Sequence, residues 1–141
     1  MRRWRGVVAV EGVVTEDGRL IEPTACTWAE DIEDAPVPLM PVWTGERTGD
    51  GFDWSLPMIG WADRFERVEE EGRVRIYASG PLFDDATLPE RLDLSVFVTE
   101  VTFAGEGVDY PLAVTHGRIR QIGLGGERVW DECVLVEQAD A

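Results

Sequence analysis

The chain has 141 residues, and its 28 acidic and 13 basic residues give a formal net charge of −15. Every basic residue is an arginine, and residues 1–70 (−8) and 71–141 (−7) share the excess of acid almost equally. A surface this negative repels nucleic-acid phosphates, and no apolar run approaches the ~20 residues that span a bilayer, so we expect neither nucleic acid nor membrane among the partners.

The beginning of the chain predicts extended structure. Residues 7–14 are rich in β-branched side chains and precede Asp17-Gly18, a dipeptide typical of tight turns, so we expect a hairpin here. Residues 36–43 contain three prolines, which cannot donate to a β-ladder. This stretch therefore predicts an edge strand or an extended connector.

The middle of the chain predicts a second hairpin and the one helical candidate. Residues 56–68 and 74–82 are strand-like and flank an acidic turn that ends in glycine and arginine. Residues 85–92 have possible capping aspartates, but Pro89 limits a helix there to about two turns.

The remaining segments complete a β-dominated prediction. Residues 94–103 alternate between apolar and polar side chains, with a shift of phase that predicts a β-bulge near Thr99. Later residues add one or two long strands and a terminal strand. With six tryptophans available for the core, we predict one domain over residues 1–141, a β-barrel with hairpins and one or two short helices.

Few residues are candidates for chemistry. Ser95 and His116 lie in strand-like segments whose antiparallel pairing would bring them into the same neighbourhood, and a serine nucleophile needs a base within ~3 Å. Cys26 and Cys133 are too few for a disulfide scaffold or a four-cysteine zinc site, so we expect buried thiols. The acidic groups lack the spacing of a calcium loop, and we expect no metal and no cofactor.

Short segments spread over nearly the whole chain share their order and approximate spacing with one known family. They are Trp4-Arg5-Gly6, Val10-Glu11-Gly12-Val13, Asp17-Gly18-Arg19, Thr27-Trp28, Val37-Pro38-Leu39-Met40, Gly60-Trp61-Ala62-Asp63-Arg64, Gly80-Pro81-Leu82-Phe83-Asp84-Asp85, Leu94-Ser95-Val96, Val114-Thr115-His116-Gly117-Arg118-Ile119 and Trp130-Asp131-Glu132-Cys133. Taken together they resemble the capsid maturation (prohead) proteases of tailed bacteriophages, particularly those that infect actinobacteria.

This resemblance implies an assemblin-like β-barrel flanked by helices, with a catalytic serine and histidine. Ser95 stands at the place of the nucleophile, and His116 stands where a third catalytic member would lie. The family's principal histidine falls in a Gly-rich loop, which here is residues 49–54 and has Phe52 at about that place. Because phenylalanine cannot accept a proton, the resemblance implies a degenerate, non-catalytic member.

We therefore expect a structural protein of a phage head, a minor capsid or decoration protein without proteolysis and without catalytic residues. The alternative is an active serine protease that matures the capsid, with Ser95 and His116 as a rearranged pair. A third hypothesis, an acidic inhibitor that mimics DNA, depends on the charge alone.

The expected partners are the phage major capsid protein and further copies of the chain in a homo-oligomer. Contacts are predicted through the aromatic and proline-rich stretches, with the interface residues Val37, Leu39, Trp43, Trp54 and Trp61. Packaged DNA repels an acidic protein, so we expect the exterior of the virion as the location, after synthesis in the bacterial host cytoplasm.

Overall fold

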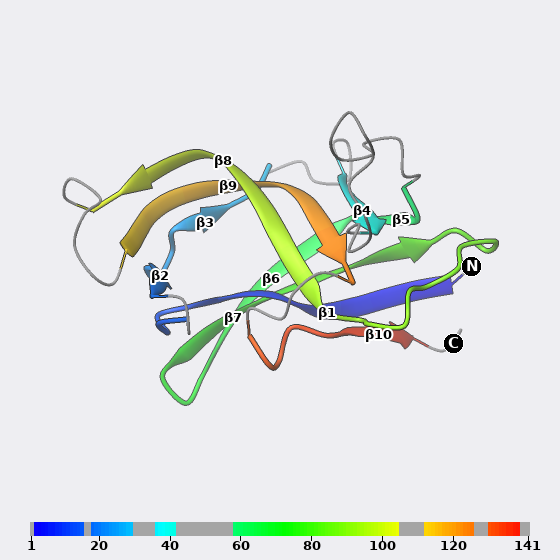
Figure 1. The fold of residues 1–141 in the computed structure, drawn as a ribbon, viewed down its shortest axis with the longest axis horizontal. Coiled ribbons are helices and arrows are strands. Elements are labelled where there is room, and N and C mark those ends of the chain that lie inside the picture. Colours follow the sequence, from blue (N-terminus) through cyan, green and yellow to red (C-terminus); the bar gives the residue numbers. More distant parts are fainter. Residues whose placement is uncertain are drawn as a thin grey trace, which may run out of the picture.

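The computed structural model describes residues 2–15, 18–29, 36–41, 58–104, 112–125 and 130–138, which form ten β-strands in one sheet (Figure 1). The strands are β1 (Arg2–Glu11), β2 (Arg19–Ile21), β3 (Cys26–Thr27), β4 (Val37–Pro41), β5 (Gly60–Ala62), β6 (Arg64–Glu70), β7 (Arg73–Leu82), β8 (Leu94–Phe103), β9 (Leu112–Leu124) and β10 (Leu135–Gln138). Their order is β10-β1-β7-β5-β4-β9-β2, with β3 and β8 also paired to β9, and β6 to β7. The β-dominated prediction is confirmed, but these ladders leave the sheet open rather than closing it into a barrel.

The predicted second hairpin is confirmed as β6 and β7. Its ladder ends with Glu70 opposite Arg73. Glu71 and Gly72 between them have positive φ angles of 52° and 78°, the pattern of a two-residue type I′ turn. The backbone of this turn matches the twist of the two strands, so local turn chemistry is sufficient to join them.

The strand predicted at residues 94–103 is confirmed as β8, which lies side by side with β9 in the arch seen in Figure 1. The register shifts between Phe97 and Val98 and again between Thr99 and Thr102. Glu100, inside the second shift, has a φ of 55°. The predicted bulge near Thr99 is therefore confirmed, and it bends the strand pair.

The first predicted hairpin is wrong, although its turn forms. Gly18 has a φ of 82°, and its N–H donates to the carbonyl of Thr15 over 3.0 Å. β2, however, pairs in parallel with β9, placing Leu20 opposite Ala113. A single backbone hydrogen bond, from the N–H of Gly12 to the carbonyl of Ile21 over 2.7 Å, joins the end of β1 to β2, and no ladder forms between these two strands.

The proline-rich stretch forms a strand inside the sheet, so the prediction of an edge strand or connector is wrong. β4 lies between β5 and β9. Pro38 is opposite Trp61 of β5, and Pro41 is opposite Leu124 of β9. Leu39 is the residue that pairs with both neighbouring strands, whereas Pro38 pairs only with β5 and Pro41 only with β9. The missing N–H of each proline is tolerated because the proline is bonded to one strand rather than two.

The predicted helix at residues 85–92 is also wrong, because this segment is irregular. Arg2 Nη1 donates to the carbonyl oxygens of Ala86 (2.8 Å) and Phe83 (3.3 Å). Those carbonyls would start a helix if they accepted N–H groups of the following turn. Pro89 has no N–H to donate to the carbonyl of Asp85 four residues earlier, and Arg2 occupies the carbonyls on either side.

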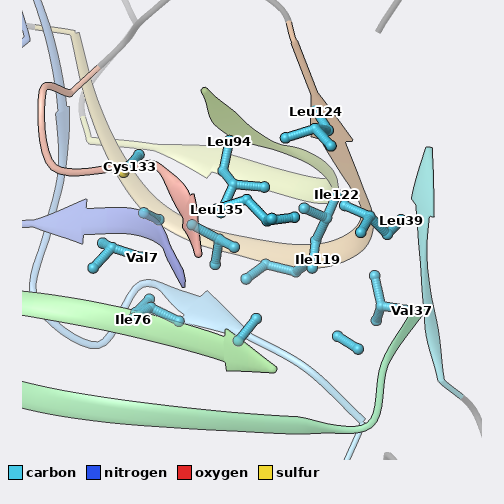
Figure 2. Close-up of a cluster of buried hydrophobic side chains, with 14 of the residues drawn as sticks. Val7, Val37, Leu39, Ile76, Leu94, Ile119, Ile122, Leu124, Cys133 and Leu135 are labelled. Atoms are coloured by element: carbon cyan, nitrogen blue, oxygen red, sulfur yellow. The ribbon is translucent and has the colours of Figure 1, made fainter. Parts of the chain in front are cut away.

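The hydrophobic core collects side chains from strands that are far apart in the sequence. Figure 2 shows Leu39, Ile122 and Leu135 meeting across strands β4, β9 and β10. Trp4 is fully buried and donates its indole N–H to the carbonyl of Trp61 over 3.1 Å. Packing, the default role predicted for the tryptophans, is confirmed for Trp4.

Two glycines of the resemblance segments allow β5 and β7 to approach closely. A Cβ atom on Gly80 would lie 1.9 Å from the carbonyl oxygen of Trp61, and one on Gly60 would lie 2.4 Å from that of Pro81. Real Cβ atoms do not approach oxygen this closely, and backbone atoms on both sides leave little room to adjust. These segments therefore have a packing role.

We expect Gly80→Ala to lower the free energy of unfolding by at least ~3 kcal/mol, because the new methyl group meets backbone that cannot move without breaking a ladder. Gly72→Ala is the matched control, since its Cβ meets nothing within 4 Å and only its positive φ costs about 1–2 kcal/mol. Urea unfolding followed by tryptophan fluorescence measures both. Equal losses for the two variants would show that the close approach is not important.

Candidate functional site

Ser95 and His116 lie on paired strands but at opposite ends of the ladder. Ser95 of β8 is opposite Gly123, and His116 of β9 is opposite Thr102. From position 95 to position 102 a strand rises roughly 20 Å at ~3.3 Å per residue. The predicted strand pairing is correct, and it is this pairing that keeps the two side chains apart.

His116 is the only histidine of the chain, and its ring is held at the β8 bulge. Its Nδ1 lies 2.8 Å from the backbone carbonyl oxygen of Glu100, and its Nε2 lies 3.5 Å from Thr27 Oγ1. Nδ1 must donate to that carbonyl, which has no proton of its own. Glu100 therefore orients the ring through its backbone and not through its carboxylate.

The predicted interface residues lie in different environments. Val37 and Leu39 are 6% and 0% exposed, so the structure assigns them to the core, and as side chains they offer no surface to a partner. Trp43 and Trp54 lie outside the described residues. Trp61 is partly buried and is the one of the five with a described surface.

Trp61 forms part of a surface hollow at the end of β7. Its ring packs edge-on against Phe83 with 5.5 Å between ring centroids. A cavity of about 340 Å³ is bounded by Trp61, Pro81, Leu82, Phe83, Asp84 and Asp85. The hollow thus combines aromatic surface with a pair of acidic residues.

A buried ion pair joins Glu11, at the end of β1, to Arg67 of β6. Arg67 Nε and Nη2 donate to the two carboxylate oxygens over 2.9 and 3.2 Å. The N–H of Cys26 donates to Glu11 Oε2 (2.9 Å), while Arg67 Nη2 donates to the carbonyl of Cys26 (2.7 Å). Because Glu11 is 0% exposed and these contacts use both of its oxygens, the pair is structural.

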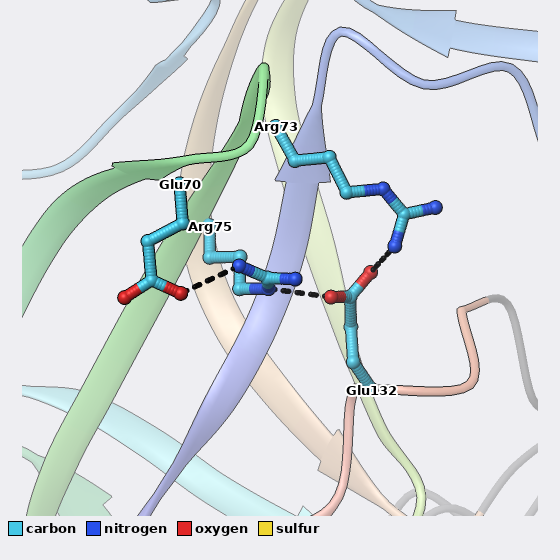
Figure 3. Close-up of polar contacts among 4 residues, drawn as sticks. All are labelled: Glu70, Arg73, Arg75 and Glu132. Atoms are coloured by element: carbon cyan, nitrogen blue, oxygen red, sulfur yellow. Dashed lines mark hydrogen bonds and ion pairs between the residues drawn. The ribbon is translucent and has the colours of Figure 1, made fainter.

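A second, more exposed network holds the β6–β7 hairpin to the segment before β10 (Figure 3). Glu132 accepts from Arg73 Nη1 over 2.9 Å and also from Arg75 Nε, and Arg75 Nη1 donates to Glu70 over 2.7 Å. The charges of these four residues balance. The network therefore uses two of the chain's arginines without leaving a free cation.

Cys26 and Cys133 are free and buried, as predicted. Within the described ranges, no three or more His, Cys, Asp or Glu side chains are grouped so that they could hold a metal ion. The same residues contain no helix that is both long and apolar enough to cross a membrane.

Comparison of the chain with protein-family models, curated proteins and solved structures gives no match.

Arg67→Met should lower the free energy of unfolding by about 2–3 kcal/mol, because it leaves the buried Glu11 carboxylate with a single backbone donor. The partial exposure of Arg67 places the value below that of a fully buried pair. Arg120→Met is the matched control: Arg120 is exposed and donates to Thr99, so we expect a change below about 0.5 kcal/mol. Chemical denaturation of both variants measures the difference, and similar losses would contradict a special role for Arg67.

We expect neither thiol to react in the folded protein. Burial, with a smaller contribution from the Glu11 charge, raises the pKa of Cys26 to about 12, although Arg67 opposes the shift. Burial also raises the pKa of Cys133. At pH 8 the thiolate fraction of Cys26 is then about 10⁻⁴, and a disulfide reagent should label both residues only in denaturant. Rapid labelling of one thiol per native chain would disagree with this burial.

Proposed function

We propose that this protein is a structural component of a phage head, a minor capsid or decoration protein built on the capsid maturation protease fold and lacking proteolysis. The observation that supports this most is the separation of Ser95 from His116 by the length of the β8–β9 ladder. The chain has no other histidine. A serine hydroxyl without a nearby base is a poor nucleophile at neutral pH, which disfavours the alternative of an active serine protease.

The fold that we propose is an assemblin-like barrel. The ladders leave a gap between β8 and β10, and a few backbone hydrogen bonds close it. The N–H of Leu94 donates to the carbonyl of Cys133, and the N–H of Leu135 donates to that of Leu92, both over 2.8 Å. An isolated β-bridge lies between these two bonds. They link the start of β8 to the start of β10, which itself pairs with β1. This supports a ring of strands around the core.

The proposed partner is the major capsid protein, contacted from the exterior of the head by a homo-oligomer. The net charge of −15 supports the exterior, because packaged DNA would repel the chain in the lumen. With Val37 and Leu39 buried, the hollow beside Trp61 and Phe83 is the part of the predicted interface that can serve for docking.

Co-expression with a phage capsid precursor tests proteolysis and binding separately. We expect unprocessed precursor with the wild type, Ser95→Ala and His116→Ala alike, and co-sedimentation of all three with assembled capsids. A cleaved product formed only by the wild type would overturn the proposal in favour of the protease.

The contact surface has its own matched pair of variants. Trp61→Ala should weaken co-sedimentation about tenfold or more, as expected for an aromatic residue at an interface. Phe97→Ala, which removes an aromatic ring that is 48% exposed on β8, should leave it unchanged. Circular dichroism verifies that both fold. Absence of co-migration for the wild type would argue against the capsid as the partner.

A further inference from the structure

A basic pocket lies on the exposed face of β1, β7 and β6. The β-ladders place Arg5 and Arg64 on either side of Ser79, with Ser79 opposite Arg5 in one ladder and opposite Arg64 in the next. Arg3 lies two positions before Arg5 and so shares its face. The pocket has a volume of about 270 Å³ and is lined by Arg3, Arg5, Arg64, Glu66, Tyr77, Ser79 and Gln138. Three of the 13 arginines of the chain thus converge on one hollow.

The pocket continues into a second, less polar one. This neighbour has a volume of about 390 Å³ and shares Arg5, Tyr77 and Gln138 with the first. Its lining includes Val136 of β10, which is 61% exposed. We call the two pockets together the β6–β10 groove. It crosses four adjacent strands, roughly 15 Å at ~4.8 Å between strands. One end is basic, and the other is lined by three valines together with the ion-paired Arg75 and Glu132.

Two of the arginines that line the groove are ion-paired and two are not. Arg75 belongs to the network with Glu70 and Glu132. Arg3 pairs with Asp63 over 3.1 Å, whereas the guanidinium of Arg5 lies 4.1 Å above the centre of the Tyr77 ring. Within the described part of the chain, the structure gives Arg5 and Arg64 no ion pair. Arg118 and Arg120 have no ion pair within these residues either, but they line neither pocket of the groove. What sets Arg5 and Arg64 apart is that they flank one serine at the same hollow.

We propose that the β6–β10 groove binds a short acidic segment of a partner protein, with a carboxylate between Arg5 and Arg64 and an apolar side chain beside Val136. Planar guanidinium groups bind carboxylates through paired hydrogen bonds, and the Ser79 hydroxyl adds a further donor. The valine side chains of the second pocket favour a peptide over a simple ion. This inference does not depend on the role in a phage head.

The charge of the rest of the protein limits the length of the ligand. A long polyanion such as nucleic acid would extend beyond the groove over acidic surface, where repulsion acts over a Debye length of ~8 Å. A segment that fits within the groove gains the attraction of the arginines and avoids most of that repulsion. Charge complementarity therefore selects a short acidic peptide.

Isothermal titration with a defined peptide tests the proposal on the full chain. The probe is the capped octapeptide Gly-Ser-Glu-Val-Glu-Val-Ser-Gly, compared with the same peptide carrying glutamine in place of glutamate. We expect the glutamine peptide to bind at least about tenfold more weakly than the glutamate peptide, because it cannot form charge-assisted hydrogen bonds. Binding of the glutamate peptide should weaken roughly fivefold between about 50 and about 300 mM salt, because salt screens the attraction.

Charge reversal locates the binding site. Arg64→Glu and Arg5→Glu should each weaken the glutamate peptide about tenfold or more, whereas Arg120→Glu, the same change at an exposed site outside the groove, should have less than about a twofold effect. Thermal melts verify that the variants fold. The Arg64 side chain is exposed and makes no hydrogen bond or ion pair with the residues that the structure describes, so its variant keeps the test valid if Arg5→Glu is unstable.

Several results would overturn the proposal. One is equal binding of the glutamine peptide, and another is unchanged binding by Arg64→Glu. Inorganic phosphate that binds as tightly as the peptide would indicate a small-ion site, and retention of a 20-base-pair duplex by the groove would indicate nucleic acid. Self-association that Arg64→Glu abolishes would identify a second copy of the chain as the occupant.

Discussion

The ion pair between the buried Glu11 and the partly exposed Arg67 is the constraint on which the arrangement of strands depends. A carboxylate with no exposure to water must be fully paired, and Arg67 provides two of its donors. The remaining donor is the N–H of Cys26, whose carbonyl accepts from the same arginine. One edge of β3 pairs with β9, and on the other edge the Glu11–Arg67 pair takes the place of a neighbouring strand. The pair therefore holds β1, β3 and β6 together at one point.

This point of attachment also explains where the histidine lies. β3 continues from Cys26 to Thr27 and pairs in parallel with β9 at Gly117, the residue after His116. The Gly117 N–H donates to the carbonyl of Ala25 over 2.9 Å, so the middle of β9 is fixed beside β3. His116 is thereby held near the bulge of β8. The contacts that stabilise the fold are therefore the ones that keep this ring away from Ser95.

The sequence predicts local structure better than it predicts strand partners. Glu71-Gly72 and the bulge near Thr99 depend on neighbouring residues, and both are found as expected. Gly18 also has the positive φ expected for it and donates to the carbonyl of Thr15, but the strand that follows pairs with β9, which lies far along the sequence. The helix at residues 85–92 fails for a similar reason, since the carbonyl of Ala86 accepts from Arg2, 84 positions earlier in the sequence.

The same limit applies to the groove. Arg5 and Arg64 are 59 positions apart in the sequence, and nothing in either segment indicates that both will lie beside Ser79. Only the shared partner strand β7 brings them together, after which the two-residue period of a strand puts their side chains on one face. An acidic chain lowers its own energy when its carboxylates pair with its arginines, as Glu132 pairs with Arg73 and Arg75. Arginines that the fold instead places side by side, with a hollow between them, are better satisfied by an anion that comes from outside the chain.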